Sequence, residues 1–181
     1  DADLSGADLR AADLSGAEVE LPRMEGHALR MREVLDAERE RYDYILIDCP
    51  PSLNALTVNA LVAADSVLIP LQCEFYALEG LSRLIDTIHR VRATLNPRLE
   101  IEGILFCMFD GRTNLPREVA AEVRSHFPDK VYQTVIPRNV RLGECPSHGK
   151  PILLYDPVSR GCQSYLQLAQ EVIDRGAAHA P

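Results

Sequence analysis

The sequence predicts an α/β domain with three layers, in which helices cover both faces of a mostly parallel, doubly wound sheet. Short apolar runs without polar alternation recur along the 181 residues, as in strands that are buried on both faces. Amphipathic segments with helical periodicity separate these runs. The links between the two kinds of segment are short, which favours βα units with right-handed crossovers.

The predicted elements alternate in chain order. Strands are expected at 44–47, 66–71, 101–108 and 131–136. Helices are expected at 24–41, 54–64, 77–95, 116–126 and 158–175. Three signals set helix bounds: Pro97 stops one helix, Pro116 starts the next, and Gly176 follows the last. Ligands of such sheets bind at the carboxyl ends of the strands, which points to Asp48, 72–76, 108–113 and 137–141.

Composition narrows the class of protein. Hydrophobic residues make up 46% of the chain and charged residues 25%, so a packed core is expected rather than disorder. The net charge of −8 disfavours a protein coated with nucleic acid, although a local basic patch stays open. The five cysteines form no Cys-x-x-Cys pair, which argues against a zinc site and favours a reducing compartment. A cytoplasmic protein is expected, because no apolar run is long enough to span a bilayer.

The first residues are repetitive. Residues 2–16 contain three tandem five-residue units, a period that resembles the pentapeptide-repeat family. A solenoid needs more stacked repeats than these, so a local duplication is the preferred interpretation. Residues 1–21 are therefore set apart from a core at 22–181. The chain starts at Asp1 without a Met, so we expect the core to be incomplete at its N-terminus.

The strongest local motif is the apolar run 44–47, which ends at Asp48 and is followed by Pro50 and Pro51. A carboxylate at the end of a buried strand resembles a Walker B element. One such carboxylate can orient the water shell of a nucleotide-bound Mg²⁺, which prefers hard oxygen ligands. The alternative is an ordinary turn aspartate after a strand.

Six blocks of sequence, in order, resemble the ParA/Soj family of partitioning ATPases, which are deviant P-loop NTPases. They begin at Asp48-Cys-Pro-Pro-Ser-Leu, Leu56-Thr-Val-Asn-Ala-Leu, Val67-Leu-Ile-Pro-Leu-Gln, Met108-Phe-Asp-Gly-Arg-Thr-Asn, Val135-Ile-Pro-Arg-Asn-Val-Arg-Leu and Pro146-Ser-His-Gly-Lys-Pro-Ile. The resemblance implies a chromosome- or plasmid-partitioning ATPase. Such proteins form ATP-dependent homodimers, bind non-specific DNA on the nucleoid, and hydrolyse ATP when a ParB partner stimulates them.

The resemblance also implies roles for individual residues. Asp48 is similar to the Walker B aspartate, which holds Mg²⁺ through water. Met108, Pro137 and Arg138 lie on loops that resemble the ATP-binding pocket for adenine. Arg112 and Arg141 resemble arginines that touch DNA, a role that suits a permanently charged, bidentate phosphate ligand. The alternative for each arginine is a solvated surface residue or a local ion pair.

The sequence contains no Lys-Gly-Gly-x-Gly-Lys-Thr loop, the Walker A motif of this family. The segment 143–150 is a decoy, because Pro146 removes an amide donor and Pro151 stands where a Mg²⁺-binding hydroxyl is required. The aspartate that positions the attacking water is absent too. We therefore expect no catalytic residue in this chain and no ATP hydrolysis by it alone.

Three alternatives stay open. One is a truncated, ATP-independent relative that keeps a DNA or partner surface. Another is an interaction module in which residues 2–21 belong to a pentapeptide-repeat region fused to a degenerate NTPase core. The third is a MinD-like positioning ATPase, although the tail at 174–181 is short and not basic, and no membrane partner is expected.

Overall fold

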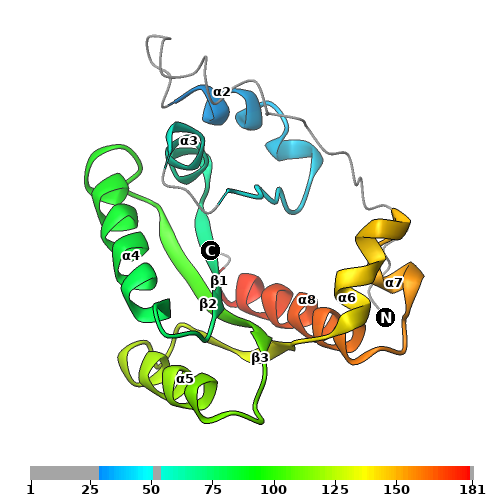
Figure 1. Ribbon diagram of the computed structural model, residues 1–181. Helices are drawn as coiled ribbons and strands as arrows, with labels where there is room; N and C mark the ends of the chain where they lie inside the picture. Colours follow the sequence, from blue (N-terminus) through cyan, green and yellow to red (C-terminus); the bar gives the residue numbers. More distant parts are fainter. Residues whose placement is uncertain (1–28, 51–53, 180–181) are drawn as a thin grey trace. The chain divides into compact units, whose positions relative to one another are not determined.

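The computed structural model describes residues 29–50 and 54–179 (Figure 1). The repetitive tract at 2–16 and the first part of the helix predicted at 24–41 lie outside this range. The chain divides into two compact units, residues 1–64 and 65–181, and each is described by itself.

The described part of the first unit is helical. It contains α2 (Arg30–Asp36), the short 3₁₀ helix η3 (Arg39–Arg41) and α3 (Ala55–Ala63). The side chain of Asn54 caps α3 by accepting a hydrogen bond from the backbone N–H of Thr57 at 3.1 Å. Two arginines from the preceding helices, Arg32 and Arg39, donate to the carbonyls of Val62 and Ala63. These bonds satisfy carbonyl groups that the last turn of a helix leaves unpaired.

The prediction of a strand at 44–47 is wrong for this structure. Residues 44–50 are neither helix nor strand, and the side chain of Leu46 is 89% exposed. A strand is defined by hydrogen bonds to a neighbouring strand. No other strand lies among the described residues of this unit, so the apolar run has no ladder partner there.

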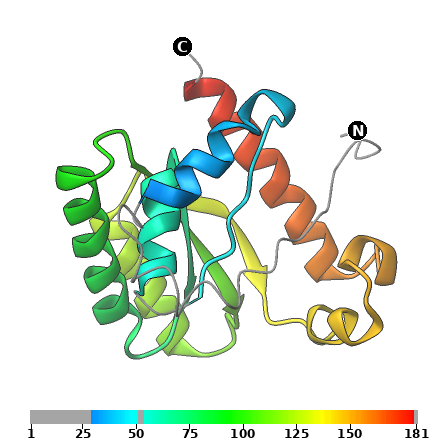
Figure 2. The same ribbon diagram turned by 90° about the horizontal axis from the view of Figure 1, so that it is seen from above.

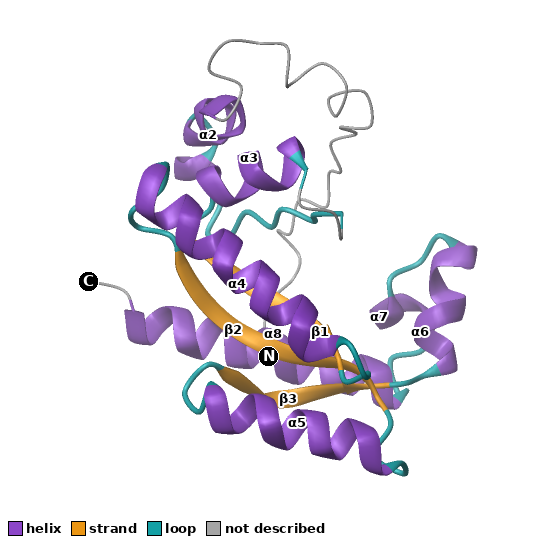
Figure 3. Ribbon diagram, turned by 60° about the vertical axis from the view of Figure 1, so that its left-hand side comes forward, coloured by secondary structure: helices purple, strands orange, loops and turns teal. Residues whose placement is uncertain are grey.

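The second unit contains a parallel sheet. Its chain order is β1 (Ser66–Gln72), α4 (Ala77–Thr94), β2 (Glu100–Phe109), α5 (Asn114–His126) and β3 (Val131–Pro137). The spatial order is β1-β2-β3, and both pairs are parallel. Helices α4 and α5 cover one face, and α8 (Arg160–His179) covers the other (Figures 2 and 3). The predicted three-layer α/β architecture is therefore confirmed for this unit.

The core of this unit lies between the layers. Ile104 and Phe106 of β2 are completely buried, as expected for the central strand of the three. On the other face, Leu105, Tyr132 and Ile136 form a cluster against which Leu168 and Val172 of α8 pack. This packing fixes α8 against β3.

Three short helices were missed by the sequence prediction. They are α6 (Val140–Glu144), the 3₁₀ helix η4 (Cys145–His148) and α7 (Ile152–Tyr155). Each is shorter than two turns, so no amphipathic period could reveal it. The decoy segment 143–150 thus forms helical turns that end at Gly149, whose φ of 59° is left-handed. Helix α8 also continues past Gly176, because one glycine weakens a helix without ending it.

The β2–β3 ladder is irregular in two places. Ile104 pairs with Val131, Phe106 with Val135, and Phe109 with Pro137. Extra residues therefore bulge first in β3, after Val131, and then in β2, before Phe109. Bulges of this kind re-aim the residues that follow them. Both lie before the carboxyl ends of their strands, where the candidate site is found.

Candidate functional site

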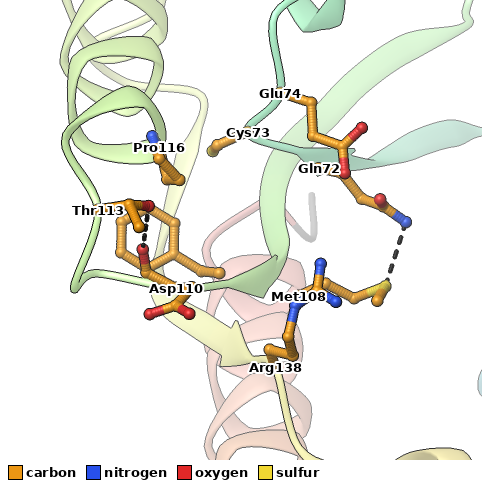
Figure 4. Close-up of a pocket in the computed structure, with 9 residues that line it drawn as sticks. Gln72, Cys73, Glu74, Met108, Asp110, Thr113, Pro116 and Arg138 are labelled. Carbon is orange, nitrogen blue, oxygen red and sulfur yellow. Dashed lines mark hydrogen bonds between the residues drawn. The ribbon is translucent and has the colours of Figure 1, made fainter.

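The carboxyl ends of the three parallel strands lie at one edge of the sheet. Ligands of parallel α/β sheets bind at this edge. Two adjoining pockets of about 340 and 470 Å³ lie at this edge, and Phe109, Asp110 and Arg138 line both. Figure 4 shows the smaller pocket. The smaller pocket is also lined by Gln72, Cys73, Glu74, Met108, Thr113 and Pro116. The larger is also lined by Gly111, Arg112, Pro137 and Arg160. Their volumes fall in the range of small-molecule sites, about 300–1,000 Å³.

Met108 has an unusual backbone conformation. Its φ is +49°, a region that side chains other than glycine rarely adopt. The strained residue coincides with the bulge in β2, and its side chain is 45% exposed at the pocket rim. The side-chain amide of Gln72 donates to Met108 Sδ at 3.2 Å, which links the ends of β1 and β2 (Figure 4). Strain of this kind gathers at functional sites.

Pro137 and Arg138 reach the same edge from β3. The backbone N–H of Arg138 donates to the carbonyl of Phe109 at 3.2 Å, and Pro137 pairs with Phe109. Figure 4 shows Arg138 beside Met108 at the pocket rim. The structure therefore brings together Met108, Pro137 and Arg138, which the sequence singled out on separate loops.

Arg112 is held by a carboxylate. Asp110 accepts from the guanidinium of Arg112 at 2.8 Å through Nε and 2.6 Å through Nη2, and also from its backbone N–H at 3.1 Å. These bonds from Arg112 hold the pKa of Asp110 well below its usual range. The Arg112 side chain is nevertheless 86% exposed, so the pair lies open to solvent beside the larger pocket.

Arg141 is paired as well. Asn139 caps α6 by accepting from the Arg141 backbone N–H at 2.8 Å. The Arg141 guanidinium lies 2.9 Å from a carboxylate oxygen of Glu144 and 3.3 Å from one of Asp156. The hydroxyl of Tyr155 donates to the same Glu144 oxygen at 3.2 Å. Both candidate DNA-contacting arginines thus form ion pairs in this conformation.

Asp48 belongs to the first unit and lies in the segment without helix or strand. Among the described residues, no group of three or more His, Cys, Asp or Glu side chains could hold a metal ion. The role of Asp48 in holding Mg²⁺ stays a prediction.

Sequence reasoning located most of the pocket through the strand-end rule, which covered 72–76, 108–113 and 137–141. It missed Pro116 and Arg160. Arg160 starts α8, far along the chain from any strand end, so no local signal could have placed it at the pocket.

Comparison with known proteins identifies the family. The chain is 58% identical over 166 residues to the chromosome partitioning protein ParA of Caulobacter vibrioides, and 59% identical over 162 residues to the sporulation initiation inhibitor protein Soj of Bacillus subtilis. These matches cover 91% and 90% of the chain. A family model described as an AAA domain matches residues 9–101, just over half of the chain. The chain belongs to the ParA/Soj family.

The ParA/Soj fold also agrees with a solved structure. Cobyrinic acid a,c-diamide synthase from Mycobacterium smegmatis, with bound ATP analogue and magnesium, matches 93% of the chain with a TM-score of 0.74 and 31% identity. The chain spans 62% of that protein, and 62% and 64% of the Caulobacter and Bacillus relatives. It therefore represents somewhat less than two thirds of the length of its ParA/Soj relatives.

No described helix is both long enough and apolar enough to span a membrane.

Proposed function

We propose that this chain is part of a ParA-type ATPase of chromosome or plasmid partitioning. The protein would form an ATP-dependent homodimer, bind non-specific DNA on the nucleoid in the cytoplasm, and respond to a ParB-like partner. Membership of the ParA/Soj family supports this activity. The observation that carries it is that Met108, Pro137 and Arg138 line two adjoining pockets at the same edge of the sheet.

This edge suits the base of a nucleotide. The pockets combine apolar surface from Met108, Phe109 and Pro137 with backbone groups and the Arg138 guanidinium. Flat apolar contacts with a few placed polar groups are the usual way to hold a planar ring. Bound ATP would supply the phosphoanhydride bond and Mg²⁺ the charge neutralisation. The chain's own part would be to orient the base.

The phosphate end of the nucleotide needs groups that the 181 residues do not contain, because they include no Walker A loop. We propose that Asp48 orients the Mg²⁺ water shell only in a protein that carries such a loop. This chain by itself would then neither bind ATP tightly nor hydrolyse it. A clear Mg²⁺-dependent hydrolysis rate from the purified chain would contradict this proposal.

The DNA contacts would come from Arg112 and Arg141. Both side chains are at least partly exposed, and a guanidinium can donate two parallel hydrogen bonds to the oxygens of one phosphate. Affinity built on phosphate contacts is independent of sequence and falls steeply with salt. Two copies of the same surface on a homodimer would strengthen the affinity by avidity.

The nucleotide proposal is tested by equilibrium binding of ATP to the protein that carries its P-loop. Arg138→Ala should weaken ATP binding by about tenfold, since it removes a charged group from the pocket wall. Arg98→Ala is the matched control, because Arg98 is exposed just before β2, at the amino end of that strand. Equal ATP affinity in the wild type and Arg138→Ala would contradict the proposed base pocket. DNA binding by the chain alone, without ATP, would favour the ATP-independent alternative.

A further inference from the structure

The bulge in β3 leaves backbone groups outside the ladder. Phe106 lies two positions after Ile104 in β2, whereas its partner Val135 lies four positions after Val131 in β3. The additional residues fall within 132–134. Their backbone groups cannot all pair with β2, and a buried N–H group needs another acceptor.

A side chain of α8 supplies that acceptor. The carboxylate of Glu171 accepts from the backbone N–H of Gln133 at 2.8 Å and of Thr134 at 2.9 Å, one bond to each oxygen. Arg175, one helical turn later, lies 2.9 Å from the same carboxylate and donates to the carbonyl of Val131 at 3.0 Å. The Glu171 side chain is only 17% exposed. Two side chains of α8 therefore hold the bulge from the face of the sheet opposite α4 and α5.

The aromatic ring inside the bulge strengthens this arrangement. Tyr132 is fully buried, and the Arg175 guanidinium lies 4.0 Å from the centre of its ring. On β2, Gly103 leaves the room that the ring occupies, since a Cβ there would lie 2.5 Å from Tyr132 Cε2. The bulge is thus a packed and hydrogen-bonded feature rather than a loose loop.

The bulge decides which residues of β3 reach the pocket edge. Regular pairing from Ile104 and Val131 onward would place Ile136 opposite Phe109. The β3 bulge advances the register by two residues and the β2 bulge returns it by one, so Pro137 occupies that position instead. Loss of the β3 bulge alone would therefore shift the end of β3 by two residues, or about 6.6 Å. The bond between the Arg138 N–H and the Phe109 carbonyl depends on the observed register.

We infer that Glu171 is a positioning residue for the candidate nucleotide pocket. Its carboxylate stabilises the β3 bulge, and the bulge sets the register that brings Pro137 and Arg138 to the pocket wall. This inference rests on the proposed function, because it assigns Glu171 to the selection of the base by the same pocket. Glu171 itself lines neither pocket, so it acts only through β3.

The first test uses the 181-residue chain and amide hydrogen exchange followed by NMR. Glu171→Gln keeps the shape of the side chain but replaces one carboxylate oxygen with an NH2 group. This NH2 group cannot accept the hydrogen bond of the backbone N–H that faces it. Exchange should accelerate at Gln133 and Thr134, and also at Arg138, by at least about tenfold. Leu168→Ala is the control on the same helix, because Leu168 packs on the cluster of Leu105, Tyr132 and Ile136 but its apolar side chain accepts no hydrogen bond from the bulge amides. It should lower Tm while leaving the ratio of Arg138 exchange to that of other core amides unchanged.

The second test uses the protein with its P-loop and compares the affinities for ATP and GTP. Glu171→Gln should reduce the preference between the two bases by about tenfold. A displacement of the pocket wall by about 1 Å is enough to produce an effect of that size or larger. Leu168→Ala should keep the preference, even where it lowers Tm.

The outcomes separate the two proposals. Unchanged Arg138 exchange in Glu171→Gln would overturn the inference, whatever the nucleotide data show. An unchanged ATP-to-GTP ratio in a variant that still binds ATP would overturn it too, while the proposed function stands. If the wild-type protein with its P-loop binds neither nucleotide, the proposed function fails, and with it the role of Glu171 in base selection.

Discussion

Residues 44–47 and 66–72 carry similar apolar runs, but only the second run is a strand. In β1, Ile69 and Leu71 are buried, and the strand pairs with β2 from Ser66 to Gln72. In the first run, Leu46 lies almost fully exposed. The contrast shows that an apolar run becomes a strand when a neighbour accepts and donates its backbone hydrogen bonds. Hydrophobicity alone does not suffice.

The largest expected effect tests this contrast by truncation of one side chain in each run. Ile69→Ala should lower the free energy of unfolding of this chain by about 2–5 kcal/mol, the usual result of a cavity in a packed core. Leu46→Ala should change it by less than about 0.5 kcal/mol, as for other exposed positions. Urea denaturation followed by circular dichroism measures both values. Equal losses in the two variants would show that the first run is packed like the second.

A smaller effect comes from two glycines of the second unit that differ in their surroundings. Gly103→Ala should destabilise the unit by about 1–3 kcal/mol, since its Cβ would clash with the Tyr132 ring and lie 2.8 Å from the Lys130 carbonyl. Gly80→Ala, inside α4 with nothing within 4 Å of its Cβ, should stabilise it by about 0.5–1 kcal/mol. Thermal denaturation gives both signs. A stable Gly103→Ala variant would mean that the ring moves freely.

Much of this architecture could be predicted from the sequence. The strands predicted at 66–71, 101–108 and 131–136 are confirmed, because each of these runs pairs with a parallel strand in its own unit. The run at 44–47 failed because local pattern says nothing about partners. The pocket edge was located through strand ends. The bulges, the strained Met108 and the contacts of Glu171 depend on tertiary pairing, which no local period encodes.

Pairing also matters for charged side chains, because an arginine that is bound to a carboxylate is less available to another anion. Asp110 accepts two hydrogen bonds from the guanidinium of Arg112, so the phosphates of DNA would have to compete with this carboxylate if Arg112 contacts DNA as proposed. Asp110→Asn should therefore raise DNA affinity by about two- to fivefold. Glu79→Gln removes the same charge from an exposed pair with Arg83 on α4 and serves as the control. Fluorescence anisotropy at two salt concentrations measures both. Equal gains from the two variants would assign the effect to net charge alone.

The smallest expected effect concerns pH. Burial acts to raise the pKa of Glu171, but the N–H groups of Gln133 and Thr134 outweigh it and lower that pKa on balance. The carboxylate thus stabilises the fold fully above the ordinary glutamate pKa of about 4.3, and this contribution is lost as the pH falls through the lower folded value. Glu171→Gln should therefore flatten the decline of stability with falling pH below about pH 4.3. A decline of unchanged steepness would contradict this account of the bulge.

The most direct test of the account is the amide hydrogen exchange of Ile45, Leu46 and Ile47, measured in this chain and in the protein that carries a P-loop segment. We expect little protection of these amides in the chain alone. We expect their exchange to slow by at least about a hundredfold when the P-loop segment supplies a neighbouring strand. Strong protection in the chain alone, or none in the longer protein, would contradict the view that residues 44–47 become a strand only when a neighbouring strand pairs with them.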